Sequence, residues 1–526
     1  MQSSVVGAAI ALGLGTVVSA SAADYDIVEK GLPELQQDLA SGRVTSVQLV
    51  SAYTARIAAL NPRLHAVIAV NPQALDDARA ADAARARGAK LGPLAGVPIL
   101  IKDNIESNDP MATTAGSLAL KDNVTRRDAP VAARLKAAGA IILGKTNLSE
   151  WANIRSSHSI SGWSGVGGQA RNPYALDRST CGSSAGSGAA AAASLAAATV
   201  GTETDGSVTC PSSANGLVGL KPTVGLVSRT HIVPISHSQD TAGPMTRSVR
   251  DAALLLTAMA GSDPADPATA SADAHRTDYA AGLRPEALKG VRVGVMRFAA
   301  GFHPETEAVF NQALAVLKDA GATLVEIDAF PNAVEIGRRE HDVLMWELKA
   351  DLNAYLATTD ARQVPTRSLA DVIAWNRAHA ASEMPLFAQE LFEAAQATTD
   401  LADPAYLKAE AEARKAAGPD GIDAMLKARS VVVLVAPTLG PSWLIDPVLK
   451  DRPSSGGAGG PAAVAGYPHL TVPMGQVDGL PVGLSFIGTA WSEPALLAYG
   501  YAFEQRAKAR QAPTYLATAP TPAAGQ

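Results

Sequence analysis

Apolar residues along this chain occur in two patterns, at helical spacing and in short continuous runs. Helical spacing predicts helices over 26–61, ending in a turn at Asn61-Pro62, then over 74–90 and 130–138. The continuous runs, rich in β-branched residues, predict buried strands at 97–103, 140–144, 291–295, 323–327, 431–435, 470–472 and 482–487. Helices that alternate with buried strands indicate an α/β layer architecture.

Two stretches interrupt this alternation. Residues 161–225 are rich in Gly, Ser and Thr, carry few charges and include an alanine run at 189–198, which predicts a helix packed closely on a sheet. Because a linker would carry solvating charge, we interpret this stretch as a buried site that exposes its backbone. Residues 331–428 are helical and charged, which predicts a helical insertion or cap, with a separate domain as the alternative.

The N-terminus predicts export. Residues 5–18 are apolar or small and are followed by an Ala20-Ser21-Ala22 cleavage pattern, so residues 1–22 have the form of a signal peptide. The mature chain is then soluble, without stable membrane insertion, and periplasmic or secreted. Since Met1–Ser4 contains no Lys or Arg, an uncleaved anchor or a misassigned start is the alternative. Residues 516–526 are expected to form a flexible tail.

Composition excludes several classes of protein. The 526 residues are 47% hydrophobic, and 44 Lys and Arg against 50 Asp and Glu give a net charge of −6. That balance disfavours disorder and a basic nucleic-acid surface. The nine histidines show no close ligand spacing, so we expect no metal. The two cysteines, Cys181 and Cys210, are expected to be buried thiols, with a single disulfide as the alternative.

Lys102 is the first candidate for chemistry. It follows the apolar run 97–101, where burial would remove hydration from the ammonium group and lower its pKa toward neutrality. A neutral amine can act as a general base. The alternative is a lysine that reaches past the strand end into solvent.

Two glycine-rich loops offer hydroxyl nucleophiles. Ser183 lies in the first, and Ser207 follows a Thr-Asp-Gly turn that could direct several backbone N–H groups at one point. The first loop also matches the G-x-S-x-G nucleophile elbow, with Ser184 at its centre. An esterase of the α/β-hydrolase type that uses Ser184 is therefore an alternative.

The ordered motifs resemble the amidase signature family over about residues 25–510. The matching segments are Gly96–Asn104, Gly144–Trp151, Arg171–Pro173, Cys181–Ser184, Gly201–Ser207, Gly219–Thr223, Asp240–Pro244 and Gly479–Leu484. Three stretches are most similar to the bacterial peptide amidase branch: Leu148–Asn153, His158–Trp163 and Gly201–Ser207. The resemblance implies one α/β/α domain over 25–515, built around a large mixed, twisted sheet.

The resemblance also implies a Ser–cis-Ser–Lys triad. It places the nucleophile at Ser207, the cis-serine at Ser183 after a cis Gly182–Ser183 peptide, and the general base at Lys102. The oxyanion hole would be formed by the backbone N–H groups of Thr204, Asp205, Gly206 and Ser207. The chemistry implied by the family resemblance needs no cofactor.

The expected activity is that of a serine amidohydrolase acting through an acyl-enzyme, with peptide C-terminal amides as the first substrate class. Aryl-acyl amides, fatty-acyl amides, carbamates and small esters are alternatives within the same chemistry. We expect a small-molecule or peptide amide as partner and a monomer or homodimer. A non-enzymatic subunit role, as in amidotransferase complexes, is the alternative from another class.

Overall fold

The computed structural model describes residues 25–330, 333–454, 456–457 and 459–520. The predicted signal peptide, 1–22, lies outside the described residues, as do residues 521–526 of the predicted tail.

An 11-stranded sheet forms the centre of the structure, in the order β1-β3-β2-β6-β8-β7-β12-β13-β11-β9-β10. Its strands are β1 (Val67–Val70), β2 (Pro98–Lys102), β3 (Ile141–Thr146), β6 (Ala198–Glu203), β7 (Val218–Lys221), β8 (Thr241–Thr246), β9 (Arg292–Met296), β10 (Thr323–Ile327), β11 (Val433–Pro437), β12 (His469–Val477) and β13 (Leu480–Ile487). A separate two-stranded sheet pairs β4 (Trp163–Ser164) with β5 (Gly168–Gln169).

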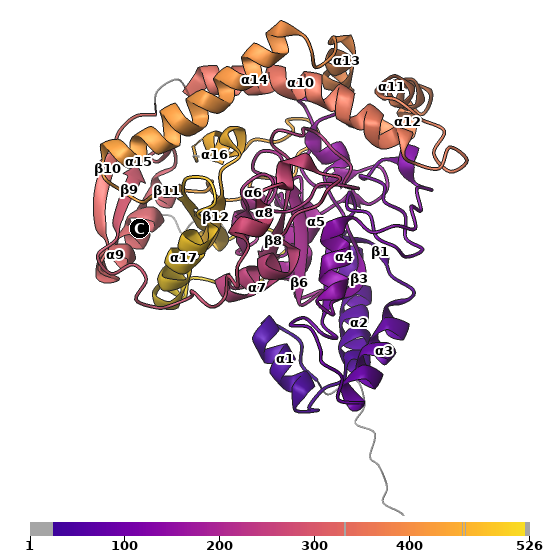
Figure 1. The fold of residues 1–526 in the computed structure, drawn as a ribbon, viewed down its shortest axis with the longest axis horizontal. Coiled ribbons are helices and arrows are strands. Elements are labelled where there is room, and N and C mark those ends of the chain that lie inside the picture. The colour runs from indigo at the N-terminus through magenta and orange to yellow at the C-terminus, as the bar shows by residue number, and fades with distance from the viewer. Residues whose placement is uncertain (1–24, 331–332, 455, 458, 521–526) are drawn as a thin grey trace, which may run out of the picture.

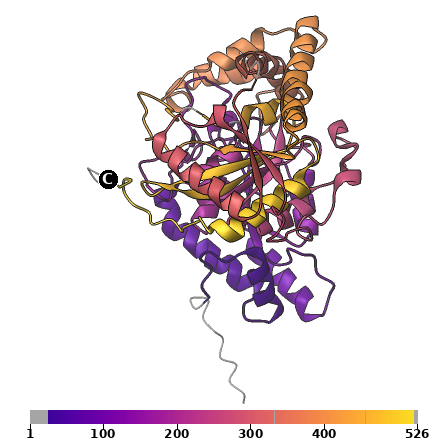
Figure 2. The same ribbon diagram turned by 90° about the vertical axis from the view of Figure 1, so that its left-hand side faces the viewer.

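The large sheet is mixed. Strand β2 runs parallel to both β3 and β6, and β9 runs parallel to β10 and β11. The central strands β8, β7, β12 and β13 are joined by antiparallel ladders. Seen from the side, successive strands cross at an angle, which is the twist of the sheet (Figure 2).

Helices surround the sheet (Figure 1). They are α1 (Leu32–Ala40), α2 (Ser46–Leu64), α3 (Ala74–Ala86), α4 (Pro130–Ala137), α5 (Ala185–Ala192), α6 (Thr209–Ala214), α7 (Val249–Met259), α8 (Ala272–His275), α9 (Pro304–Asp319), α10 (Ala333–Ala357), α11 (Leu369–Ala378), α12 (Ala380–Glu383), α13 (Glu390–Ala397), α14 (Pro404–Ala417), α15 (Ala424–Ala428), α16 (Gly459–Ala465) and α17 (Glu493–Ala507). Every residue of β2, β3, β6, β8 and β11 is buried, as expected for strands covered on both faces. The predicted fold class, an α/β/α arrangement around a large mixed sheet, is confirmed.

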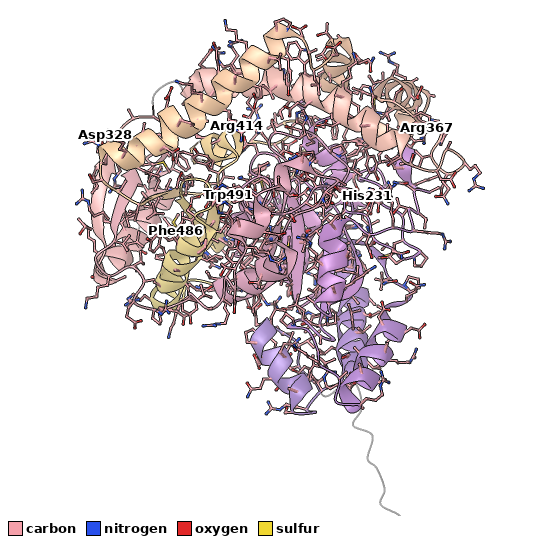
Figure 3. The ribbon with its side chains drawn as sticks, viewed as in Figure 1. His231, Asp328, Arg367, Arg414, Phe486 and Trp491 are labelled. Carbon is pink, nitrogen blue, oxygen red and sulfur yellow. A yellow bond between two sulfur atoms is a disulfide. The ribbon has the colours of Figure 1, made fainter. Side chains whose placement is uncertain are left out.

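Between β10 and β11 the described chain forms helices and no strand. Helices α10 and α14 pack against each other and arch over one end of the sheet (Figure 1). Loop residue His231 lies below this arch (Figure 3). The arch therefore covers the sheet end at which β2 and β6 finish and β8 begins.

Two local predictions are wrong, and four strands of the large sheet were not predicted. The predicted turn at Asn61-Pro62 lies inside α2, which continues to Leu64 and ends at His65 in a left-handed conformation. The alanine run is not one helix, because α5 stops at Ala192 and Ala198 already begins β6. Strands β1, β6, β7 and β8 were not predicted; in β6, β7 and β8, Gly, Thr and Ala replace the β-branched runs that indicate a strand.

No helix among the described residues has both the length and the apolar character that a membrane span requires.

A buried guanidinium joins the helical segment between β10 and β11 to the rest of the structure. Arg155 is fully buried and donates to Glu150 Oε2 at 2.6 Å. It also donates to the main-chain oxygens of Glu383, Phe387 and Ala388, at 3.0, 2.9 and 2.8 Å. One side chain therefore satisfies acceptors from two distant parts of the sequence.

We predict that Arg155→Leu lowers the free energy of unfolding by about 3 kcal/mol or more, because it leaves a buried carboxylate and several carbonyls without a donor. Chemical denaturation followed by circular dichroism measures the change. Arg362→Leu is the matched control, since its ion pair with Asp360 is exposed to solvent and is expected to contribute little to stability. Equal effects of the two substitutions would contradict the prediction.

Candidate active site

Lys102 is the last residue of β2 and is fully buried. Its Nζ lies 2.7 Å from Ser183 Oγ, 2.9 Å from Thr202 Oγ1 and 3.3 Å from Thr202 O. Asn104 supports this arrangement by donating from Nδ2 to Thr202 Oγ1 at 2.9 Å. Adjacent parallel strands place Lys102 beside Thr202, because β2 pairs with β6 in register.

Burial lowers the pKa of Lys102 to about 7, and the nearby charges of Asp240 and Glu203 partly oppose that effect. The three atoms that surround Nζ are hydroxyl or carbonyl oxygens, and none of them belongs to a carboxylate. The amine therefore exchanges its proton near neutral pH, as a general base requires.

Ser183 lies in the turn that precedes α5, and the Gly182–Ser183 peptide is cis. Its carbonyl accepts from Ser149 N at 3.0 Å, and its side chain is fully buried. The turn thus directs the Ser183 hydroxyl inward to Lys102.

Ser184 has a different environment. Its Oγ donates to Thr202 O at 3.0 Å and accepts from Thr202 N at 3.2 Å, and the side chain is fully buried. Both hydrogen bonds go to main-chain atoms, so this hydroxyl joins the turn to β6. That environment does not fit the nucleophile of the α/β-hydrolase alternative.

Ser207 lies in the turn between β6 and α6. Its carbonyl accepts from Ser184 N at 3.1 Å, which joins the two serine-bearing loops, and the residue keeps 8% exposure. Among the residues that the structure describes, the Ser207 hydroxyl has no hydrogen-bond partner. Gly206 has a φ of +74°, and a Cβ added there would meet nothing within 4 Å, so open space adjoins the turn.

The N–H groups of this turn are free to bind an anion. Within the described part of the chain, those of Thr204, Asp205, Gly206 and Ser207 donate to no protein acceptor. Four unpaired donors beside a hydroxyl have the composition that an oxyanion hole needs.

Two carboxylates hold the turn in shape. Glu203 accepts from Val208 N at 2.6 Å and from Thr209 N at 2.9 Å, so its carboxylate links the two ends of the turn. Asp240 accepts from Thr204 Oγ1 at 2.5 Å, and burial raises the pKa of Asp240 to about 6. Sequence reasoning assigned no role to either residue; their place inside the matching motifs was the available indication.

Two cavities share Asp240 as a lining residue, and Thr204 of the turn also lines the smaller one. The smaller, of about 30 Å³, is lined by Asn104, Thr202, Thr204 and Asp240 among others, and could hold about two waters. The larger, of about 350 Å³, lies under α10, whose Asp351 and Tyr355 line it. The helical segment thus contributes residues to a cavity next to the site; the sequence predicted that segment 331–428 helps to form the pocket but did not identify the residues.

A cluster of His237, Glu347 and Asp351 has ligand types suited to a metal. However, Glu347 already accepts hydrogen bonds from Ser236, Ser238 and Tyr406. The cluster joins the loop before β8 to α10, and Tyr406 extends this contact to α14.

Cys181 and Cys210 form a disulfide, with their Cα atoms 6.0 Å apart. The expectation of two buried thiols is therefore wrong, and the alternative of a single disulfide holds. The two cysteines are 29 positions apart in the sequence. The turn before α5 and the first turn of α6 bring them together, and sequence spacing does not show that proximity.

The comparisons with known proteins agree over most of the chain. Residues 48–497 match the family model described as Amidase. A probable amidase of Arabidopsis thaliana is 39% identical over 94% of this chain and 93% of the relative. A glutamyl-tRNA(Gln) amidotransferase subunit of Moorella thermoacetica is 37% identical over 90% and 95% of the two chains. Among solved structures, native peptide amidase from Stenotrophomonas maltophilia is 52% identical with a TM-score of 0.88, covering 93% of this chain and 99% of that one.

We predict that the denatured but unreduced protein takes up no iodoacetamide, whereas prior reduction allows alkylation of both cysteines. Intact-mass spectrometry measures the uptake, and a non-reducing peptide map should contain a cross-linked Cys181–Cys210 fragment. Alkylation without prior reduction would contradict the disulfide.

Proposed function

This chain belongs to the amidase family, and we propose that it hydrolyses linear amides through a Lys102–Ser183–Ser207 triad, with peptide C-terminal amides as its substrates. That it is an amide hydrolase follows from the family. The roles of the three residues and the substrate class are the proposal.

The observation that carries the proposed triad is the set of atoms around Lys102 Nζ. A neutral amine has two N–H donors and one lone pair. Thr202 offers two acceptors, its carbonyl and its hydroxyl, which can take both N–H groups. The lone pair is then left for the Ser183 hydroxyl at 2.7 Å.

The proposed reaction moves protons along this line. Lys102 accepts the Ser183 proton, Ser183 accepts the Ser207 proton, and Ser207 Oγ forms a bond to the amide carbonyl carbon. The oxyanion binds the N–H groups of the 204–207 turn. As the C–N bond breaks, the relayed proton passes to the departing nitrogen, which leaves as ammonia. Water then adds to the acyl-serine, and the acid product and the Ser207 hydroxyl are released.

In the described structure the Ser183 and Ser207 hydroxyls do not hydrogen-bond to each other, although Ser184 N donates to Ser207 O and so joins their loops. Catalytic hydrogen bonds in unliganded sites are often long and shorten in the substrate complex. The proposed transfer between the serines therefore takes place once an amide is bound over the turn.

The substrate class is supported by similarity at 52% identity to a peptide amidase over nearly the whole length of that structure. Aryl-acyl amides, fatty-acyl amides and carbamates are the competing substrates within this chemistry. Purified protein, without any partner, should release ammonia from a peptide amide faster, by kcat/KM, than it cleaves an anilide or a fatty amide. Absence of turnover without a partner would favour the subunit role instead.

The proposal includes export to the periplasm or the medium. The apolar run at 5–18 with its Ala20-Ser21-Ala22 pattern supports it. So does the disulfide, because disulfides persist in oxidising compartments and are rare in the cytosol. N-terminal sequencing of the protein from cell fractions tests it.

We predict that Ser207→Ala abolishes both ammonia release and acyl-enzyme formation, because the attacking oxygen is removed. Ser184→Ala is the matched control and should retain measurable turnover, since Ser184 contacts main-chain atoms of Thr202 rather than the base. Mass spectrometry of protein quenched during turnover locates the acyl group. An adduct on any residue other than Ser207, or complete loss of activity in Ser184→Ala alone, would contradict the assignment.

We also predict that kcat/KM rises with pH through a limb centred near 7, because Lys102 must lose its proton before it can accept one from Ser183. Asp240→Asn should move this limb to lower pH, since it removes a negative charge that favours protonated Lys102. The pH–rate profiles of the two proteins measure both effects. An optimum near pH 4, or a shift in the opposite direction, would refute this role for Lys102.

A further inference from the structure

The only two cysteines in the sequence lie next to the two catalytic serines of the proposed triad. Cys181 precedes Ser183 by two positions, and Cys210 follows Ser207 by three. Their disulfide therefore joins the loop that carries the cis-serine to the first turn of α6, which directly follows the turn that carries the nucleophile.

We propose that the Cys181–Cys210 disulfide is a positioning element for the reaction, which sets the spacing between the two segments that carry the Ser183 and Ser207 hydroxyls. This inference rests on the proposed function. It concerns how the two serine loops are held together and adds no further reacting group.

The local structure supports a positioning role on the side of Ser183. Cys181 has a φ of +55°, a left-handed conformation that residues other than glycine seldom adopt. The chain enters the Gly182–Ser183 turn from this residue, so the direction of the Ser183 side chain depends on it. A cross-link at Cys181 Sγ fixes the side chain at this point.

On the side of Ser207, Cys210 lies in the first turn of α6, and its N–H donates to Gly206 O at 2.8 Å. That bond connects the cysteine directly to the turn whose N–H groups would bind the oxyanion. A shift of Cys210 is therefore expected to move the turn and the Ser207 hydroxyl with it.

Hydrogen bonds also join the same two loops. Ser184 N donates to Ser207 O, and Asn215 Nδ2 donates both to Thr180 O at 3.0 Å and to Pro211 O at 2.7 Å. These bonds can keep the loops in contact without the disulfide, so the protein should fold when it is removed. The hydrogen bonds would then keep the two loops in contact, and the disulfide would restrict the distance between them.

The disulfide is packed in an apolar cluster. Cys181 is 7% exposed and lies with Ala214 and Trp443, against which Cys210 and Leu439 also pack. Reductant reaches such a bond slowly, so substitution is the main test and reduction the second. Reduction breaks the Sγ–Sγ bond with two electrons and two protons from dithiothreitol, which becomes its cyclic disulfide.

The experiment compares oxidised wild-type protein, Cys181→Ser, Cys210→Ser and the double variant on a peptide amide. Folded protein is quantified by circular dichroism well below each Tm. We expect kcat per folded molecule to fall about tenfold or more, since a misplacement of about 1 Å can cost about 100-fold, with KM within about threefold. The acid limb of the pH profile should stay near 7, because the cysteines are not among the groups around Lys102.

Dithiothreitol supplies the second arm and its control. It should lower kcat of the wild-type protein to the level of the double variant and leave the double variant unchanged, and reoxidation should restore the wild type. If any variant fails to fold, the effect of dithiothreitol on kcat of the wild-type protein decides whether the disulfide has a positioning role.

Two results would overturn the inference. One is an unchanged kcat per folded molecule in the variants and in reduced wild type, with only Tm lowered; the disulfide would then serve stability alone. The other is that oxidised wild-type protein leaves the peptide amide, anilide and fatty amide intact. That result would refute the proposed function, and the inference that rests on it would fall as well. The two failures are distinguishable because the second is seen before any cysteine is changed.

Discussion

The proposed chemistry depends on the burial of one amine, that of Lys102. Lys102 Nζ is surrounded by oxygens of Ser183 and Thr202, without a bonded carboxylate to stabilise its charged form. Each unit by which its pKa falls corresponds to about 1.4 kcal/mol of disfavoured protonation, so the remainder of the fold must supply several kcal/mol to keep the group there. A lysine with this environment is costly for stability and suited to accept a proton at neutral pH.

The fold offsets that cost by packing the surrounding segments tightly. Strand β2 lies between β3 and β6, which places Lys102 next to Thr202. Gly186 allows α5 to approach closely, because a Cβ there would lie 2.3 Å from Ala66 O and 2.5 Å from Asn147 N. The Gly-, Ser- and Ala-rich stretch is thus buried packing around the site and not a linker, as its lack of charge indicated.

Much of the fold and the site could be predicted from the sequence, because those features leave a local pattern. The β-branched runs predicted β2, β9, β10 and β13, and the lysine at the end of an apolar run indicated a buried amine as one of two interpretations. Strand β6 could not be recognised, because its Gly and Thr residues serve close packing and hydrogen bonding and do not form the apolar run that indicates a buried strand.

Other features depend on tertiary contacts that no spacing reveals. The disulfide requires two turns to meet, and the role of Asp240 requires the loop before β8 to fold back onto Thr204. The contribution of α10 to a cavity beside the site depends on how the helical segment lies over the sheet. Each of these was missed or left open by the sequence because the partner lies in a distant segment.

The most direct test is the titration of Lys102 itself. Protein labelled with ε-¹³C-lysine gives one NMR signal per lysine, and Lys102→Met identifies the resonance of interest. We expect this signal to titrate with a midpoint near 7, because burial destabilises the ammonium form. A midpoint near 10.5, the ordinary value for lysine, would show that the amine is charged at neutral pH and would contradict its role as the base.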